Sequence, residues 1–262
     1  PMTKETVAPH QEPSKPNITN KNPQNTGTNK DDLIRRIRLG MSIPMENDPA
    51  IDAQLNWYLN NPEYLNRVFS RSEPYLYHIV ETLENRGIPL DIALLPVVES
   101  AFDPFAYSHG RASGLWQIIP GTGTHLGLKQ NWWFDARRDV LESTRAAFDY
   151  LQYLHGLFEG DWLLALAGYN SGEGNVSRAV RRAESEGLPT DFWHIRHYLP
   201  AETQAYVPRL IALIQVITES EFYNIELPEI SNAPFFEVVE TSGQMDMALA
   251  ADLAGITTDE LY

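Results

Sequence analysis

At residues 94–104 the sequence reads LLPVVESAFDP, an apolar helical run that ends in an acid. Glu99 follows Ile92 by seven residues and Leu95 by four, so the three side chains share one helix face. That face is expected to point into the core, where desolvation raises the pKa of a carboxyl group. Pro96 breaks the hydrogen-bond ladder and is expected to kink the helix beside Glu99. A proline and a half-buried acid within one helix are locally unfavourable, and such features are typical of a functional site. The alternative interpretation is that Glu99 is a solvated residue at a helix C-terminus without a function.

Composition limits the classes of protein that this chain can be. Its 262 residues suffice for one large domain with or without appendages. The formal net charge of −15 argues against nucleic acid as a partner, because phosphate binding needs a basic surface. Cysteine is absent, which excludes disulfides, thiolate metal sites and a cysteine nucleophile. No apolar run is long enough to cross a bilayer. The chain starts at Pro1 without the charged and then apolar segments of a signal peptide, as expected of a trimmed protein or of one that was never exported.

The chain divides into three parts by composition. Residues 1–45 are rich in Pro, Asn, Thr and Lys and are predicted to be a disordered linker, with an amphipathic piece at Leu33–Leu39 that is able to dock. Residues 46–226 carry dense helical periodicity and no convincing alternating strand, so the fold class is predicted to be all-α. Its helix signals include prolines at 49, 62 and 89, N-cap acids at 48, 139 and 161, and a C-terminal glycine at 87.

The C-terminal part differs in kind from the helical domain. Phe235–Glu240 is apolar and β-branched enough to form a strand. Met247–Ala254 and Thr257–Leu261 follow with short helical patterns. Residues 232–262 are therefore predicted to be a small, truncated β-α-α unit.

Polar and aromatic side chains in three further segments are candidates for a binding site around Glu99. Ser108 and Gln117 offer hydroxyl and amide groups that suit a neutral polyhydroxyl or acetamido ligand. Tyr169 and Asn170 end a helix beside flexible glycines, and Tyr206 lies within another helix. Tyrosine rings can stack on sugar faces while their hydroxyls bond to the sugar, and core packing is the alternative for each ring.

Other chemistries fit the sequence less well. Asp103 lies four residues after Glu99, but Pro104 moves it off the helical face, so we interpret Asp103 as structural. Glu173, in a glycine-flanked loop, can reach the cleft, although nothing in the sequence sets its direction. Ser100 lacks the nucleophile elbow of serine hydrolases, and the histidines lack metal-ligand spacing apart from a weak pair at 194 and 197. No metal or other cofactor is expected.

Together these motifs resemble the lytic murein transglycosylases of the soluble-lytic-transglycosylase superfamily, over roughly residues 48–224. The phrase from Leu94 to Gly127, with Asn131-Trp132-Trp133 and Asp135, looks most like the membrane-bound D-type branch. Residues 243–261 resemble the start of a LysM peptidoglycan-binding module without its closing strand. The motifs that carry the resemblance are Glu99-Ser100, Ser108, Gly114-Leu115-Trp116-Gln117, Ile119-Pro120, Ala167-Gly168-Tyr169-Asn170-Ser171-Gly172 and Ala205-Tyr206-Val207.

The resemblance implies a lysozyme-like helical fold that cleaves the MurNAc–GlcNAc bond of peptidoglycan without water. Glu99 is then the single acid and base: it protonates the glycosidic oxygen and afterwards takes the proton of the C6 hydroxyl, which leaves 1,6-anhydro-MurNAc. Ser108 and Gln117 would orient the substrate, with Ser108 near the acetamido group. Tyr169 would contact the cleft, Asn170 would hold the loop, and Tyr206 would help to close the site.

The implied partners are peptidoglycan glycan strands, and the implied location is the periplasm at the outer membrane, through a lipid anchor upstream of Pro1. Two other functions stay open at this point. One is a hydrolytic muramidase similar to goose-type lysozyme, in which water attacks. The other is a non-catalytic peptidoglycan-binding scaffold that acts through the LysM-like tail.

Overall fold

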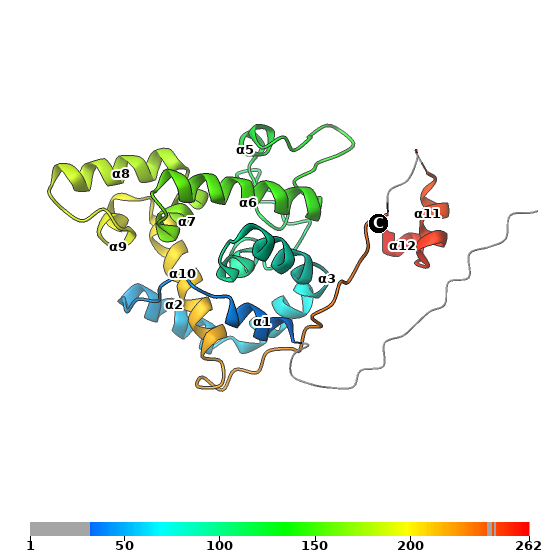
Figure 1. Cartoon of the computed structure of the whole chain (residues 1–262), viewed down its shortest axis with the longest axis horizontal. Coiled ribbons are helices and arrows are strands. Elements are labelled where there is room, and N and C mark those ends of the chain that lie inside the picture. Colours follow the sequence, from blue (N-terminus) through cyan, green and yellow to red (C-terminus); the bar gives the residue numbers. More distant parts are fainter. Residues whose placement is uncertain (1–31, 240–242, 244, 262) are drawn as a thin grey trace, which may run out of the picture.

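A computed structural model of the chain describes residues 32–239, 243 and 245–261. Figure 1 shows helices that pack around one another, with the last two in a separate C-terminal segment. Within the described residues the backbone forms isolated β-bridges and no strand, so the predicted all-α class is confirmed. No helix in this described part is long and apolar enough to span a bilayer.

The α-helices are α1 (Leu33–Leu39), α2 (Pro49–Leu59), α3 (Pro62–Arg86), α4 (Leu95–Glu99), α5 (Pro120–His125), α6 (Val140–Leu157), α7 (Trp162–Ser171), α8 (Glu173–Ser185), α9 (Phe192–Ile195), α10 (Ala201–Thr218), α11 (Met247–Ala254) and α12 (Thr258–Leu261). Two 3-10 helices, η1 (Leu90–Leu94) and η2 (Arg196–Tyr198), complete the set.

The predicted caps account for where several of these helices begin and end. The side chains of Asp48, Asp139 and Asp161 accept hydrogen bonds from backbone N–H groups in the first turns of α2, α6 and α7. Gly87 ends α3 with a φ of 65°, a left-handed conformation that costs glycine nothing. These starts and stops therefore depend on local hydrogen bonding that the sequence displays.

The segment that carries Glu99 differs from the single kinked helix predicted from Pro89. The structure has a 3-10 turn, η1, followed by the short helix α4, with Pro96 in the first turn of α4. Proline has no N–H to continue a helical ladder, but in a first turn that group needs no partner. The change of helix type at Leu94–Leu95 thus replaces the expected kink, and Glu99 is the last residue of α4.

The core forms around α10, which crosses the middle of the molecule in Figure 1. One apolar stripe of this helix is buried: Val207, Leu210, Ile211, Ile214 and Ile217. Ala212, Leu213 and Val216 on its other sides are buried as well, as expected for a helix surrounded by protein. α10 contacts α2, α4, α7 and η1, so it positions α4 and α7 relative to each other.

The predicted linker is too long at its C-terminal end. Residues 1–31 lie outside the described residues, but the amphipathic piece at Leu33–Leu39 forms α1 and docks as expected. Leu33, Ile34 and Ile37 are buried in the core because they recur on one helix face. The Leu33 N–H also donates to the Ile230 carbonyl at 2.9 Å. Residues 32–45 and the segment up to Ile230 therefore belong to the packed body, which is longer than 46–226.

The C-terminal segment confirms the predicted helices and contradicts the predicted strand. α11 spans Met247–Ala254 as expected, and α12 begins at Thr258, one residue late. Residues 235–239 are not in a strand, and Glu240 lies outside the described residues. A strand is stable only when its backbone pairs with another, and among the described residues no segment pairs with 235–239.

Candidate active site

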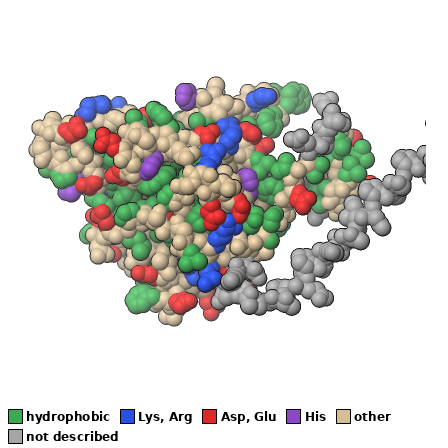
Figure 2. All heavy atoms as spheres, viewed as in Figure 1, with side chains coloured by type: hydrophobic (Ala, Val, Ile, Leu, Met, Phe, Trp, Pro, Cys, Tyr) green, Lys and Arg blue, Asp and Glu red, His purple; other side chains and the backbone are tan. Residues whose placement is uncertain are grey.

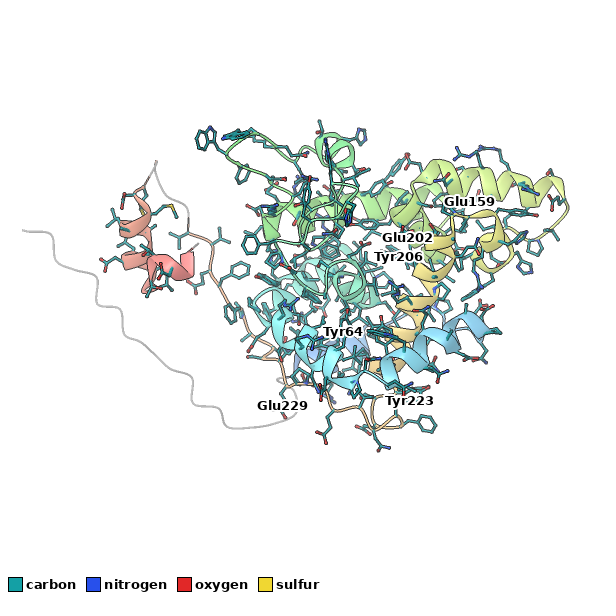
Figure 3. All side chains as sticks on the ribbon, turned by 180° about the vertical axis from the view of Figure 1, so that it is seen from behind. Tyr64, Glu159, Glu202, Tyr206, Tyr223 and Glu229 are labelled. Atoms are coloured by element: carbon teal, nitrogen blue, oxygen red, sulfur yellow. The ribbon has the colours of Figure 1, made fainter. Side chains whose placement is uncertain are left out.

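A groove of about 630 Å³ runs along the helical body between α4, α5, α6, α7 and the start of α10. All six residues that the sequence singled out lie on its wall, namely Glu99, Ser108, Gln117, Tyr169, Asn170 and Tyr206. They come from α4, α7, α10 and the connecting loops, so only the packing of these elements brings them together. Figure 3 shows Tyr206 and Glu202 together on α10, near the middle of the molecule.

Glu99 is half-buried at the C-terminus of α4, and its carboxyl group faces the groove. The Tyr206 hydroxyl donates a hydrogen bond to Glu99 Oε1. Burial raises the pKa of Glu99 to about 7, and the negative charge of Glu202 adds to this, while the Tyr206 hydrogen bond acts in the opposite direction. A carboxyl group with this pKa can be protonated at neutral pH and can also ionise, which suits proton transfer in both directions.

Two tyrosines lie near the Glu99 carboxyl group, and of these Tyr206 donates a hydrogen bond to it. The Tyr169 hydroxyl donates to the Trp116 carbonyl oxygen at 2.7 Å, which ties α7 to the loop that carries Gln117. Burial, and next the negative charge of Glu99, hold the pKa values of Tyr169 and Tyr206 well above the usual range for tyrosine. Both hydroxyls therefore keep their protons at any physiological pH.

The backbone around the groove departs from ordinary conformations. Ala101, Phe102, Arg111 and Gln117 all have positive φ, between 46° and 63°, although none is a glycine. Such conformations cost about 1 to 3 kcal/mol each and persist only where surrounding contacts impose them. One such contact is the Ser100 hydroxyl, which donates to the Leu115 carbonyl at 2.9 Å. The strained turn directly after Glu99 thus fixes where α4 ends.

Ser108 and Gln117 lie on the same loop wall and are both engaged in it. The Ser108 hydroxyl oxygen accepts from the Ala112 N–H at 3.0 Å. The Gln117 side-chain NH₂ donates to the Gly114 carbonyl at 2.9 Å. Gly114 itself has a φ of 79°, and a Cβ there would lie 2.0 Å from the Arg137 carbonyl oxygen. This loop is therefore packed closely against the segment that contains Arg137.

Asn170 joins the end of α7 to the start of α10. Its side-chain carbonyl accepts from the Thr203 hydroxyl at 2.7 Å, and its NH₂ group donates to Glu202 Oε1 at 3.5 Å. These contacts tie the end of α7 to the first turn of α10, and the role of Asn170 in holding the loop stays a prediction.

Among the groove residues that the sequence did not single out are the polar side chains of Tyr150, Glu202 and Arg209. Glu202 and Arg209 lie four residues before and three after Tyr206, so the helical period of α10 was the signal that places them on its face. Tyr150 lies on α6, where its place on the groove wall depends on the packing of α6 against α7. The sequence suggested Glu99 as the single acid of the site. The structure places a second carboxyl group, that of Glu202, in the same groove.

The two other carboxylates considered from the sequence do not line the groove. Asp103 accepts a hydrogen bond from the Phe105 N–H at 2.9 Å and stabilises a turn, in line with its structural interpretation. Glu173 is the first residue of α8, and its Oε2 accepts from the Tyr150 hydroxyl at 2.9 Å. Its direction, which the sequence left open, is thus set by Tyr150.

Residues 78–190 match the family model described as the transglycosylase SLT domain. The chain is 46% identical over 223 residues to the membrane-bound lytic murein transglycosylase D of Escherichia coli strain K12, which covers 85% of this chain and 48% of that protein. It is 28% identical over 151 residues to the membrane-bound lytic murein transglycosylase F of Desulfosudis oleivorans, which covers 55% of this chain and 32% of that protein.

Among solved structures, the 70 kDa soluble lytic transglycosylase of Escherichia coli is similar over 64% of this chain and 30% of its own, at 22% identity and a TM-score of 0.45. The chain spans about half the length, or less, of these relatives.

Proposed function

We propose that the chain is the catalytic part of a peptidoglycan lytic transglycosylase, on the premise that residues 78–190, which match the transglycosylase SLT domain model, act as that domain does. The observation that carries the proposal is a half-buried glutamate, Glu99, with a pKa of about 7, in a groove walled by tyrosines and amides. The substrate is the MurNAc–GlcNAc β-1,4 bond of glycan strands, in keeping with the names of the relatives.

In the proposed reaction Glu99 acts first as an acid and then as a base. The protonated carboxyl group gives its proton to the glycosidic oxygen as the bond to C1 breaks. The C6 hydroxyl of MurNAc then attacks C1, and its proton returns to the Glu99 carboxylate. The product end is 1,6-anhydro-MurNAc, and the enzyme is restored without water or a second carboxylate. Tyr206, bonded to Glu99 Oε1, orients the carboxyl group throughout.

A hydrolytic muramidase is the second candidate, and Glu202 is the observation that favours it. A second carboxylate in the groove is what an inverting glycosidase uses to activate water. Mass spectrometry of products from purified peptidoglycan separates the two reactions, because hydrolysis adds one water to each product. We expect mainly anhydro products, and predominantly reducing ends would replace the transglycosylase proposal with the hydrolytic one.

The pH dependence of kcat/KM reports the pKa of Glu99 in the free enzyme. Since Glu99 must start protonated, we expect activity to fall as pH rises through about 7, approaching tenfold per pH unit beyond it. Activity that stays constant up to pH 9 would contradict the role of Glu99 as the initial acid.

Two variants are expected to move this alkaline limb in opposite directions. Glu202→Gln removes a negative charge that raises the pKa of Glu99, so the limb moves to lower pH. Tyr206→Phe removes a hydrogen bond that lowers the same pKa, so the limb moves to higher pH. Full pH profiles of both variants are the measurement, and shifts of the same sign would show that the limb belongs to another group.

The location and binding partners follow from the same proposal. We place the protein in the periplasm, associated with the envelope, since the relatives named above include membrane-bound murein transglycosylases. Association with the outer membrane through an upstream lipid anchor, and a LysM-like role for residues 232–262, are further parts of the proposal. Ser108, Gln117, Tyr169 and Asn170 are proposed to bind the sugar.

A further inference from the structure

Trp132 and Trp133 project from the tip of a small hairpin between α5 and α6, and each is 90% exposed. The hairpin is closed by the Asn131 N–H, which donates to the Phe134 carbonyl at 2.8 Å, and by the Ala136 N–H, which donates to the Lys129 carbonyl at 2.9 Å. Adjacent tryptophans rarely present nearly all of their surface to water, because burying it is favourable. An apolar surface exposed in this way is typical of a binding site.

The hairpin holds its shape without burying either indole. The side-chain oxygen of Asn131 accepts from the N–H groups of both Trp133 and Phe134 at 2.8 Å. At its base, the carboxyl group of Asp135 makes two hydrogen bonds with the Arg137 guanidinium, at 2.9 and 2.7 Å. The two rings are therefore presented on a preformed support, which reduces the entropy lost on binding.

The same contacts connect the hairpin to the wall of the groove. The Arg137 guanidinium, only 6% exposed, also donates to the Arg111 carbonyl at 2.6 Å and to the Ile118 carbonyl at 3.0 Å. Ile118 lines the groove, and Arg111 lies between the groove residues Gly110 and Ala112. One buried arginine thus fixes the hairpin to the loops that carry the candidate site.

We propose that Trp132 and Trp133 form a platform on which sugar rings of a glycan strand stack outside the groove. The apolar C–H face of a pyranose fits a flat indole, and the ring edge leaves the sugar hydroxyls in water. The identity of the strand as peptidoglycan rests on the proposed function. A polymer held at Glu99 extends beyond the groove, and the platform gives it a second point of attachment.

A lipid bilayer is the other surface that exposed tryptophans can enter, and charge disfavours it. The chain carries a formal net charge of −15, which repels anionic lipids. On the face shown in Figure 2, basic and acidic side chains are interspersed and no continuous basic patch forms. Glycan backbones bind by stacking and hydrogen bonding and do not need a basic surface.

The test compares two full-length proteins, Glu99→Gln alone and Glu99→Gln with Trp132→Ala and Trp133→Ala, so that the strand is not consumed. Each is titrated with glycan strands of alternating GlcNAc and MurNAc from which the stem peptides have been removed. We expect the double alanine variant to bind long strands about tenfold more weakly, as for the loss of a pair of aromatic contacts. The loss should be much smaller for a single disaccharide, which fills only the groove.

Two variants serve as controls. Phe222→Ala removes an aromatic ring that is 78% exposed, lies after the C-terminal end of α10 and contacts the ring of Tyr223. Figure 3 shows Tyr223 away from Tyr206, so this variant should bind strands normally. Trp132→Phe with Trp133→Phe keeps two flat rings and should recover most of the affinity. Thermal unfolding of every variant verifies that the fold is kept, as expected for exposed positions.

Equal affinity for long strands with and without the two indoles would overturn the proposal, as would a parent protein that binds no strands. So would losses of the same size for long strands and for the disaccharide. Binding of the parent to phosphatidylglycerol–phosphatidylethanolamine vesicles, lost in the double alanine variant while strand binding persists, would assign the platform to a membrane. Strand binding is measured with the inactive Glu99→Gln proteins, whereas lytic activity is measured with the unmutated chain. A platform that does not bind strands and a chain that does not cleave them are therefore distinguishable results.

Discussion

Replacing Glu99 with glutamine is expected to reduce the cleavage of purified peptidoglycan by about a thousandfold, the usual contribution of a positioned acid and base. Glutamine has nearly the same shape, and its side-chain oxygen can still accept the Tyr206 hydrogen bond. It has no proton to give to the glycosidic oxygen. The variant therefore removes the chemistry and keeps the groove.

The same substitution should stabilise the fold at alkaline pH. The pKa of Glu99 is raised from 4.5 in a solvated chain to about 7 in the folded protein. As pH rises from 4.5 to 7, the unfolded chain loses this proton before the folded one, so Glu99 lowers the stability progressively. Glutamine never ionises, and we expect the free energy of unfolding of the variant to exceed that of the parent by about 3 kcal/mol at pH 8 and to equal it near pH 4.

Release of soluble products from peptidoglycan and urea unfolding at the two pH values are the measurements for this variant. Glu184→Gln, at an exposed position of α8, is the matched control and should change neither quantity. Lysis by the Glu99→Gln protein at a tenth of the parent rate or more would show that another group supplies the proton.

Replacing Arg137 with alanine is expected to lower the free energy of unfolding by about 3 kcal/mol, the scale for breaking a buried ion pair from one side. The guanidinium bonds to Asp135 and to the carbonyl oxygens of Arg111 and Ile118. Without it, the half-buried Asp135 carboxylate loses its counter-charge and two carbonyls lose a donor. The hairpin and the groove loops lose their common support, so catalytic activity should fall as well.

Urea unfolding monitored by circular dichroism tests this prediction. Arg182→Ala is the control, since Arg182 pairs with Glu186 on the surface of α8 with 63% of its side chain exposed. Exposed pairs contribute at most about 1 kcal/mol, so this variant should be nearly as stable as the parent. Equal losses for the two arginines would mean that the buried contacts of Arg137 do not support the fold.

Features that depend on near neighbours in the chain were predictable. The cap acids and Gly87 act within one turn of their own position, and they marked the ends of α2, α3, α6 and α7 correctly. Asp103 was assigned to a turn because Pro104 restricts the backbone directly before it. The acid on an apolar face was visible for the same reason, since helical spacing alone aligned Glu99 with Ile92 and Leu95.

Tertiary packing decided what the local pattern left out. Residues 1–45 were assigned to a linker from their composition, although Leu33–Leu39 was expected to be able to dock. Seven residues do not form a stable helix alone, and α1 is ordered because Leu33 and Ile37 enter the core of the other helices. Phe235–Val239 has strand-like residues but no neighbour with which to pair. Tyr150 lines the groove because α6 packs against α7, which brings its ring beside that of Tyr169.

The sequence by itself determined the all-α class, several helix ends and the acid on which the proposed chemistry depends, since each follows from spacing along a single helix or turn. Only the tertiary structure decided that Glu202 shares the groove with Glu99, that Tyr206 bonds to its carboxyl group, and that Arg137 fixes the tryptophan hairpin to the groove wall. The pKa of Glu99 depends on these charges and on burial, which arise when helices from distant parts of the chain pack together.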